Sequence, residues 1–194
     1  MTAKSRPLTL TETKYRDEVV PAMMKKFKYT NPMQVPKLVK CVVNMGVGKA
    51  TEDIKVLEDA SAELAAITGQ KPVFTRAKKS ISNFKIRKGQ AIGCRVTLRR
   101  RHMFEFIDRL LNVALPRIRD FRGVNSRAFD DAGNYNLGVR EQNIFPEVIS
   151  DRIARPQGMD IAIVTTSKTK EEGLYFLYYM GVPFRDRDER LILN

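Results

Sequence analysis

The strongest chemical signal in this sequence is a cationic segment at residues 64–104, which contains 11 Lys and Arg and no Asp or Glu. It carries +11 of a net charge of +13, so the rest of the chain is nearly neutral. Because like charges repel, so long a segment of one sign is typical of a site that binds a polyanion. Nucleic acid is the commonest polyanion, since its phosphates are closely spaced and release counterions. The alternative is a solvated basic loop without a partner.

Catalytic and metal-binding patterns are weak by comparison. His102 is the only histidine, and no suitable partner lies at the spacing of a catalytic triad or a metal site. Cys41 and Cys94 fall inside expected strands, which favours two buried free thiols in a reducing cytoplasm over a disulfide. We therefore expect no enzymatic activity, no metal and no cofactor.

The turn at residues 46–51 resembles a phosphate-binding loop only superficially. A P-loop needs a glycine separated by four residues from its Gly-Lys pair and a hydroxyl after that pair, whereas this chain has Val43 and Ala50 at those positions. The turn still leads into an expected helix, so either an RNA phosphate site or a plain turn fits it. The RRM aromatic signature, the KH loop, a zinc finger and an obvious helix-turn-helix are all missing from the sequence.

Composition describes an ordinary globular chain with an unusual charge. The 194 residues are 43% hydrophobic and can bury one substantial core. The isoelectric point of about 9.9 is high enough to indicate nucleic-acid binding. No apolar run approaches the roughly 20 residues of a membrane span, and the first residues lack the apolar core of a secretory signal.

Hydrophobic periodicity predicts four helices and five strands. The helices are expected at residues 11–27, 51–68, 102–115 and 169–181, and the strands at 38–43, 71–75, 93–99, 135–139 and 161–165. Residues 76–92 are expected to form a long basic loop. Irregularly interspersed helices and strands indicate an α+β fold, with a mostly antiparallel sheet and helices packed on one face. A single domain is expected at residues 11–184, with flexible tails at 1–10 and 185–194.

Two of these elements carry detailed expectations. Thr51 is expected to cap the second helix, Ile54 to lie in its apolar stripe, and Gly69 to end it. In the strand at 93–99, Cys94, Val96 and Leu98 alternate with Arg95, Thr97 and Arg99. Alternation of this kind predicts a sheet with one apolar face and one cationic face.

Several motifs resemble the family of bacterial ribosomal protein five of the large subunit. The similarity covers about residues 12–184 and is most specific at LAAITGQKPVFTRAKKS (64–80). The other matching segments are MQVPK (33–37), VVNMGVG (42–48), IGCRVTLR (92–99), LPRIRDFRG (115–123), GNY (133–135), REQ (140–142) and GMDI (158–161).

The resemblance implies a structural role on the cytoplasmic ribosome. Members of this family bind 5S rRNA and help anchor it, beside the large-subunit rRNA, in the central protuberance. They also contact the P-site tRNA and, across an intersubunit bridge, a protein of the small-subunit head. They are not enzymes and do not associate with membranes.

Site residues follow from the matching positions and the cationic strand face. The expected 5S rRNA contacts are Asn44, Gln70, Lys71, Arg95, Thr97 and Arg99. The expected tRNA-contacting loop includes Arg76, Lys78, Lys79, Ser80, Asn83, Phe84 and Arg87. We expect the loop to be extended and mobile in the free protein, because its cations repel one another. The small-subunit contact is placed only within part of residues 109–146. A DNA-binding regulator and a role off the ribosome remain alternatives.

Overall fold

A computed structural model describes residues 9–148 and 156–185 of the chain. Its α-helices are α1 (Leu10–Lys14), α2 (Val20–Phe27), α3 (Ile54–Thr68), α4 (Arg100–Arg109) and α5 (Lys170–Met180). Its strands are β1 (Leu38–Gly46), β2 (Val73–Arg76), β3 (Ala91–Leu98), β4 (Tyr135–Val139) and β5 (Met159–Thr165). The predicted α+β class is confirmed.

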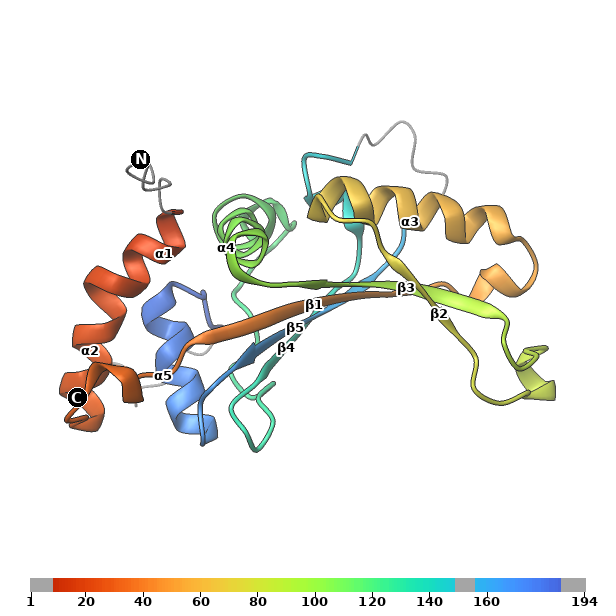
Figure 1. Cartoon of the computed structure of the whole chain (residues 1–194). Coiled ribbons are helices and arrows are strands. Elements are labelled where there is room, and N and C mark those ends of the chain that lie inside the picture. The colour runs from red at the N-terminus through yellow and green to blue at the C-terminus, as the bar shows by residue number, and fades with distance from the viewer. Residues whose placement is uncertain (1–8, 149–155, 186–194) are drawn as a thin grey trace, which may run out of the picture.

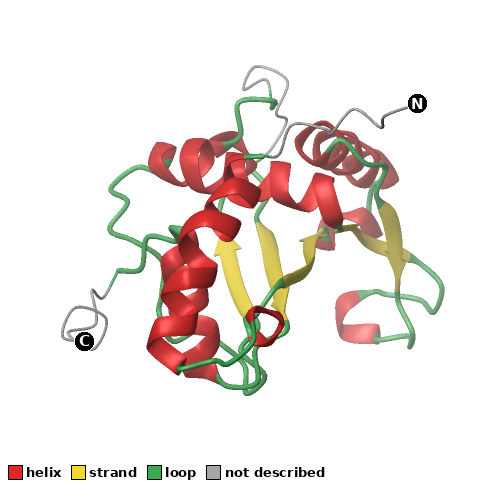
Figure 2. Ribbon diagram, turned by 60° about the vertical axis from the view of Figure 1, so that its left-hand side comes forward, coloured by secondary structure: helices red, strands yellow, loops and turns green. Residues whose placement is uncertain are grey.

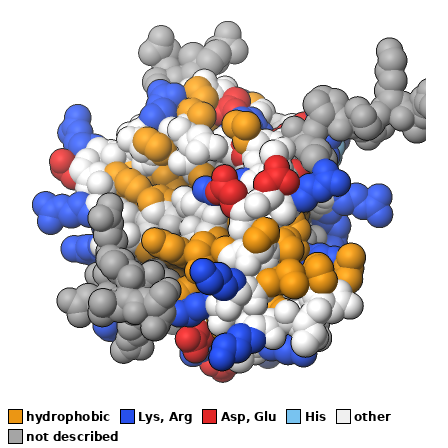
Figure 3. Space-filling model, turned by 90° about the vertical axis from the view of Figure 1, so that its left-hand side faces the viewer, with side chains coloured by type: hydrophobic (Ala, Val, Ile, Leu, Met, Phe, Trp, Pro, Cys, Tyr) orange, Lys and Arg blue, Asp and Glu red, His pale blue; other side chains and the backbone are white. Residues whose placement is uncertain are grey.

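The strands form one antiparallel sheet in the order β2-β3-β1-β5-β4. Helices α3 and α4 lie along one side of it, whereas α1, α2 and α5 gather at one end (Figure 1). Figure 2 shows the sheet from another side, with the segment between β2 and β3 extending away from the helices. Figure 3 looks onto the end formed by α1, α2 and α5, where charges of both signs and apolar side chains are mixed.

The apolar face of the sheet supplies much of the core. In β3, Cys94, Val96 and Leu98 are buried, as the alternation predicts. Cys41 lies opposite Leu98 and Met45 lies opposite Cys94, so the two cysteines are offset along adjacent strands, and both are free thiols. This confirms the sequence-based preference for free thiols over a disulfide.

The start of α3 differs from its prediction. Asp53, not Thr51, is the N-cap, because its side chain accepts a hydrogen bond from the Lys55 amide, while Thr51 ends a short 3₁₀ turn. Ile54 is 61% exposed, so it does not belong to the apolar stripe. Gly69 ends the helix in a left-handed conformation (φ 68°), as expected.

Strand β1 is longer than predicted and continues through Asn44 to Gly46. The predicted flexible tails fall mainly on residues 1–8 and 186–194, which lie outside the described residues. The division into one domain and two tails therefore remains a prediction. No helix among residues 9–148 and 156–185 is long and apolar enough to cross a membrane.

Candidate nucleic-acid interface

The sheet face opposite α3 and α4 is open. Along β1 and β3, the residues of this face apart from Gly93 are exposed or half-buried, in contrast to their buried neighbours. Antiparallel pairing aligns one residue from each strand in a row across the face, because directly opposed residues point to the same side. The row reads Val73, Arg95, Asn44, Asp160, Gly138. Polar side chains therefore occupy its centre, and glycine occupies one end.

Two further residues that were each expected to contact 5S rRNA, Gln70 and Thr97, lie in contact next to this row. Gln70 follows α3, yet its side-chain amide donates a hydrogen bond of 3.4 Å to the carbonyl oxygen of Thr97 in β3. The two residues lie 27 positions apart in sequence. Gly69 makes the contact possible, because its left-handed turn directs the chain from α3 back towards β3. Gln70 is exposed beside the half-buried Thr97, so both can still reach an external partner.

Arg99 and Lys71 lie at the margins of this surface. Arg99 is not part of β3 but is the first residue after it, at the N-cap of α4, where its extended backbone (φ −140°, ψ 160°) continues the alternation. Lys71 is exposed two residues before β2 begins. We use the term open-face site for the six predicted residues Asn44, Gln70, Lys71, Arg95, Thr97 and Arg99.

The predicted basic loop contains a short hairpin of its own. The Ala77 amide donates to the Gln90 carbonyl at 2.9 Å, and Ile81 and Ile86 exchange both of their backbone hydrogen bonds. A 3₁₀ turn at Ser82–Phe84 forms the tip, visible as the short helical turn far from the other helices in Figure 2. We call residues 77–90 the basic hairpin.

Side chains also support the basic hairpin. Arg76 donates through Nη1 to the Gly89 carbonyl at 2.9 Å, and the Lys88 amide donates to Oγ of Ser80 at 2.9 Å. The segment expected to be an extended loop therefore folds back on itself, because local backbone hydrogen bonds form despite the repulsion between its cations. Whether the basic hairpin is mobile stays a prediction.

The cations of the basic hairpin point away from the core. Lys78, Lys79, Lys85, Arg87 and Lys88 are all exposed. Phe84 is 68% exposed at the tip, so it does not anchor the hairpin to the core. Among the residues that the structure describes, none of these cations forms a salt bridge. The basic hairpin can therefore neutralise phosphates without first breaking internal ion pairs.

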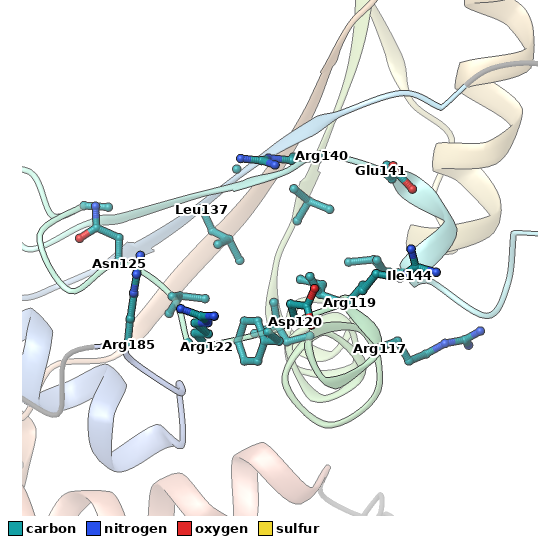
Figure 4. A pocket seen from close by; sticks show the side chains of 18 of the residues that line it. Arg117, Arg119, Asp120, Arg122, Asn125, Leu137, Arg140, Glu141, Ile144 and Arg185 are labelled. Atoms are coloured by element: carbon teal, nitrogen blue, oxygen red, sulfur yellow. The ribbon is translucent and has the colours of Figure 1, made fainter.

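A groove of about 1150 Å³ opens beside the edge strand β4 (Figure 4). Five arginines and two acids line it, namely Arg117, Arg119, Arg122, Arg140, Arg185, Asp120 and Glu141. Leu137 points into the groove from β4, facing the segment that follows α4. Most of the lining falls within residues 109–146, the range expected to meet the small subunit.

The other candidate groups do not assemble into a site. The turn after β1 leads into a 3₁₀ turn at Gly48–Thr51, not directly into α3, so it lacks the aligned amides of a helix N-terminus. Burial raises the pKa of Cys41 to about 12 and that of Cys94 to about 11. Within the described part of the chain, no cluster of His, Cys, Asp and Glu could hold a metal ion.

Sequence reasoning missed Asp160 on the open face. The strand was predicted to begin at Ile161, but β5 begins at Met159 and includes Asp160. A signal was present, because Met159, Ile161 and Ile163 alternate and are buried. That pattern places Asp160 on the opposite, exposed face.

Comparison with known proteins gives consistent matches along the chain. The family model described as ribosomal protein L5 matches residues 31–87, and the model for the C-terminus of the same ribosomal family matches residues 91–184. A large ribosomal subunit protein uL5 from Clostridium acetobutylicum is 60% identical over 171 residues, covering 88% of this chain and 95% of the relative. Proteins of the same name from Clostridium beijerinckii and Syntrophus aciditrophicus are 58% and 59% identical, covering 91% and 88% of this chain and 99% and 96% of those relatives.

Proposed function

The chain belongs to the ribosomal protein L5 family, structural and non-enzymatic proteins of the large ribosomal subunit, and we propose that it binds 5S rRNA through the open-face site. In this role it helps to attach 5S rRNA to the central protuberance of the large subunit in the cytoplasm. The observation that carries the proposal is the pairing of Asn44 with Arg95 on an exposed sheet face, next to Gln70 and Thr97.

The chemistry of the open-face site suits a folded RNA. Arg95 offers a cation to a phosphate, whereas Asn44, Gln70 and Thr97 are uncharged and offer hydrogen bonds to ribose or base edges. Phosphate contacts contribute affinity, and the uncharged contacts contribute selectivity. A purely electrostatic surface would not need the second group.

The basic hairpin serves a second RNA in this proposal, the P-site tRNA. It extends away from the helices, presents exposed cations and carries Phe84 at its tip. The basic hairpin is distant from Asn44 along the chain and projects from the sheet. Both features favour two separate RNA-binding surfaces over one continuous surface. The contact with a protein of the small-subunit head belongs within residues 109–146, where the arginine-lined groove lies.

Competition separates this proposal from a DNA-binding regulator. Labelled 5S rRNA is bound by the protein and then challenged with unlabelled 5S rRNA or with duplex DNA of equal length. We expect 5S rRNA to displace the label at a far lower concentration than DNA does. Equal competition by DNA would contradict the proposal. Sequencing the RNA that co-purifies with the tagged protein from cells then tests for 5S rRNA without choosing the ligand beforehand.

A further inference from the structure

The row across the open face includes a carboxylate, that of Asp160. Asp160 of β5 stands directly opposite Asn44 of β1, and Asn44 stands opposite Arg95 of β3. Adjacent strands are about 4.8 Å apart, so the Cα atoms of Asp160 and Arg95 are separated by about 10 Å. A negative charge at this place on a phosphate-binding surface needs a reason, because it repels phosphates.

Within residues 9–148 and 156–185, Asp160 has no structural partner that would explain its position. It is exposed, and among the described residues it makes no salt bridge or side-chain hydrogen bond. Arg95 is equally free of ion pairs there, so the two side chains do not neutralise each other. The carboxylate of Asp160 therefore retains its capacity to accept hydrogen bonds from an external partner.

The neighbours of Asp160 leave room for a planar group. On one side lies Gly138 of β4, where an added Cβ would come within 3.9 Å of the Asp160 carboxylate. With glycine at that position, the edge of the sheet stays open beside the carboxylate. On the other side lies Asn44, and the Cβ atoms of such directly opposed residues are about 5 Å apart. The Asn44 carboxamide supplies both a hydrogen-bond donor and an acceptor.

We propose that Asp160 reads the Watson–Crick edge of an unpaired guanine in the bound RNA. Guanine presents two adjacent donors there, N1–H and the N2 amino group, which match the two oxygens of one carboxylate. The same edge ends in the O6 acceptor, which the neighbouring Asn44 amide can satisfy. Adenine, cytosine and uracil each present one donor on this edge, so none of them fills both oxygens. Single-stranded loops expose bases in this way.

This inference rests on the proposed binding of 5S rRNA to the open face, and one variant separates the two. Asp160→Asn keeps the shape of the side chain but replaces one acceptor with a donor and removes the charge. If the carboxylate accepts from guanine, binding to 5S rRNA weakens roughly tenfold, as for the loss of a charge-assisted hydrogen bond. If the carboxylate only lies near phosphates, removing its charge strengthens binding.

The matched control is Asp59→Asn on α3, which removes the same charge from an exposed position on the other side of the sheet. We expect this control to change affinity by less than twofold. Thermal melting of both variants checks that the fold is retained. Unchanged or tighter binding of 5S rRNA by Asp160→Asn would overturn the inference while leaving the proposed function intact. Failure of the unmodified protein to prefer 5S rRNA over DNA would overturn the proposed function itself.

Atomic substitution in the RNA identifies the group that Asp160 contacts. Inosine lacks the N2 amino group of guanine, so we replace the unpaired guanines of 5S rRNA with inosine one at a time. At one guanine position, inosine should weaken the binding of 5S rRNA by the unmodified protein. The same inosine should cause no further loss of affinity in the Asp160→Asn variant. The inference fails if no inosine reproduces the loss, or if a 2′-deoxy substitution alone does so, because the carboxylate would then accept from a ribose hydroxyl.

Discussion

Asn44 and Arg95 are directly opposed across the β1–β3 pair, so an uncharged and a cationic side chain stand next to each other on one exposed face. Their proximity allows affinity and selectivity to be measured separately. A change at Arg95 removes a charge, whereas a change at Asn44 removes only hydrogen-bonding groups. The two substitutions should therefore differ in their salt dependence even where they cost similar amounts of binding energy.

The double variant Arg95→Ala plus Arg99→Ala should weaken 5S rRNA binding and reduce its salt dependence. Each lost phosphate contact should lower the slope of log affinity against log salt by roughly 0.7 to 0.9. Binding titrations at several salt concentrations measure that slope. The matched control, Lys25→Ala plus Lys55→Ala, removes two exposed cations from α2 and α3 and should leave the slope unchanged. An unchanged slope in the arginine variant, with a native circular dichroism spectrum, would exclude both arginines as phosphate contacts.

Asn44→Ala should cost about 1–3 kcal/mol of 5S rRNA binding if it leaves a polar group of the RNA buried without a partner. The salt slope should not change, because no charge is removed. Asn44 lies shortly before Gly46 and Gly48 in sequence, so an alternative is that it only shapes a turn. In the structure Asn44 lies inside β1, two residues before the end of the strand, so Asn44 is not part of a turn. A fall in melting temperature without a fall in affinity per folded molecule would contradict the RNA contact.

The two thiols should react slowly with a thiol reagent in the folded protein. The thiolate is the reactive form, and burial raises the pKa of Cys41 to about 12 and that of Cys94 to about 11. At pH 8 the folded protein should therefore consume little reagent until urea unfolds it. Because folding favours the neutral thiols, this contribution to stability is complete below pH 9 and is lost as the pH rises towards these raised values. Immediate labelling of both thiols without urea would contradict their burial.

The local features of the fold could be predicted because they depend on neighbouring residues. The alternation of Cys94, Val96 and Leu98 with polar residues gave the orientation of β3, and Gly69 marked the end of α3. The error at Thr51 arose because Thr and Asp are both good N-caps, and only tertiary packing decides which one is used. Ile54 fits the helical period but is the first residue of α3, where its side chain is largely exposed.

The row across the open face could not be predicted in the same way. It depends on the register between strands that are far apart in sequence, such as Asn44 with Asp160, and a shift of one residue would turn every side chain to the other face. Turn lengths do not determine that register when helices and long loops join the strands. The contact between Gln70 and Thr97 has the same origin, since it joins the end of α3 to β3.

Shortening the basic hairpin should separate the two proposed RNA surfaces. Replacing residues 78–88 with a short Gly-Ser linker retains Ala77, Gly89 and Gln90, whose backbone hydrogen bonds close the base of the hairpin. Because the open-face site lies on the sheet, 5S rRNA binding should change by less than about twofold. Retention of tRNA in the P site of ribosomes that carry the variant should fall, since five exposed cations and Phe84 are lost.

A second variant distinguishes charge from shape in the basic hairpin. Lys78→Gln plus Lys79→Gln removes two cations but retains the Ile81–Ile86 bridge and the tip. If the cations contact tRNA phosphates, this variant should weaken tRNA retention less than the deletion does, and added salt should reduce the difference from the unmodified protein. If the deletion abolished 5S rRNA binding and left tRNA retention normal, the assignment of two RNAs to two surfaces would be wrong.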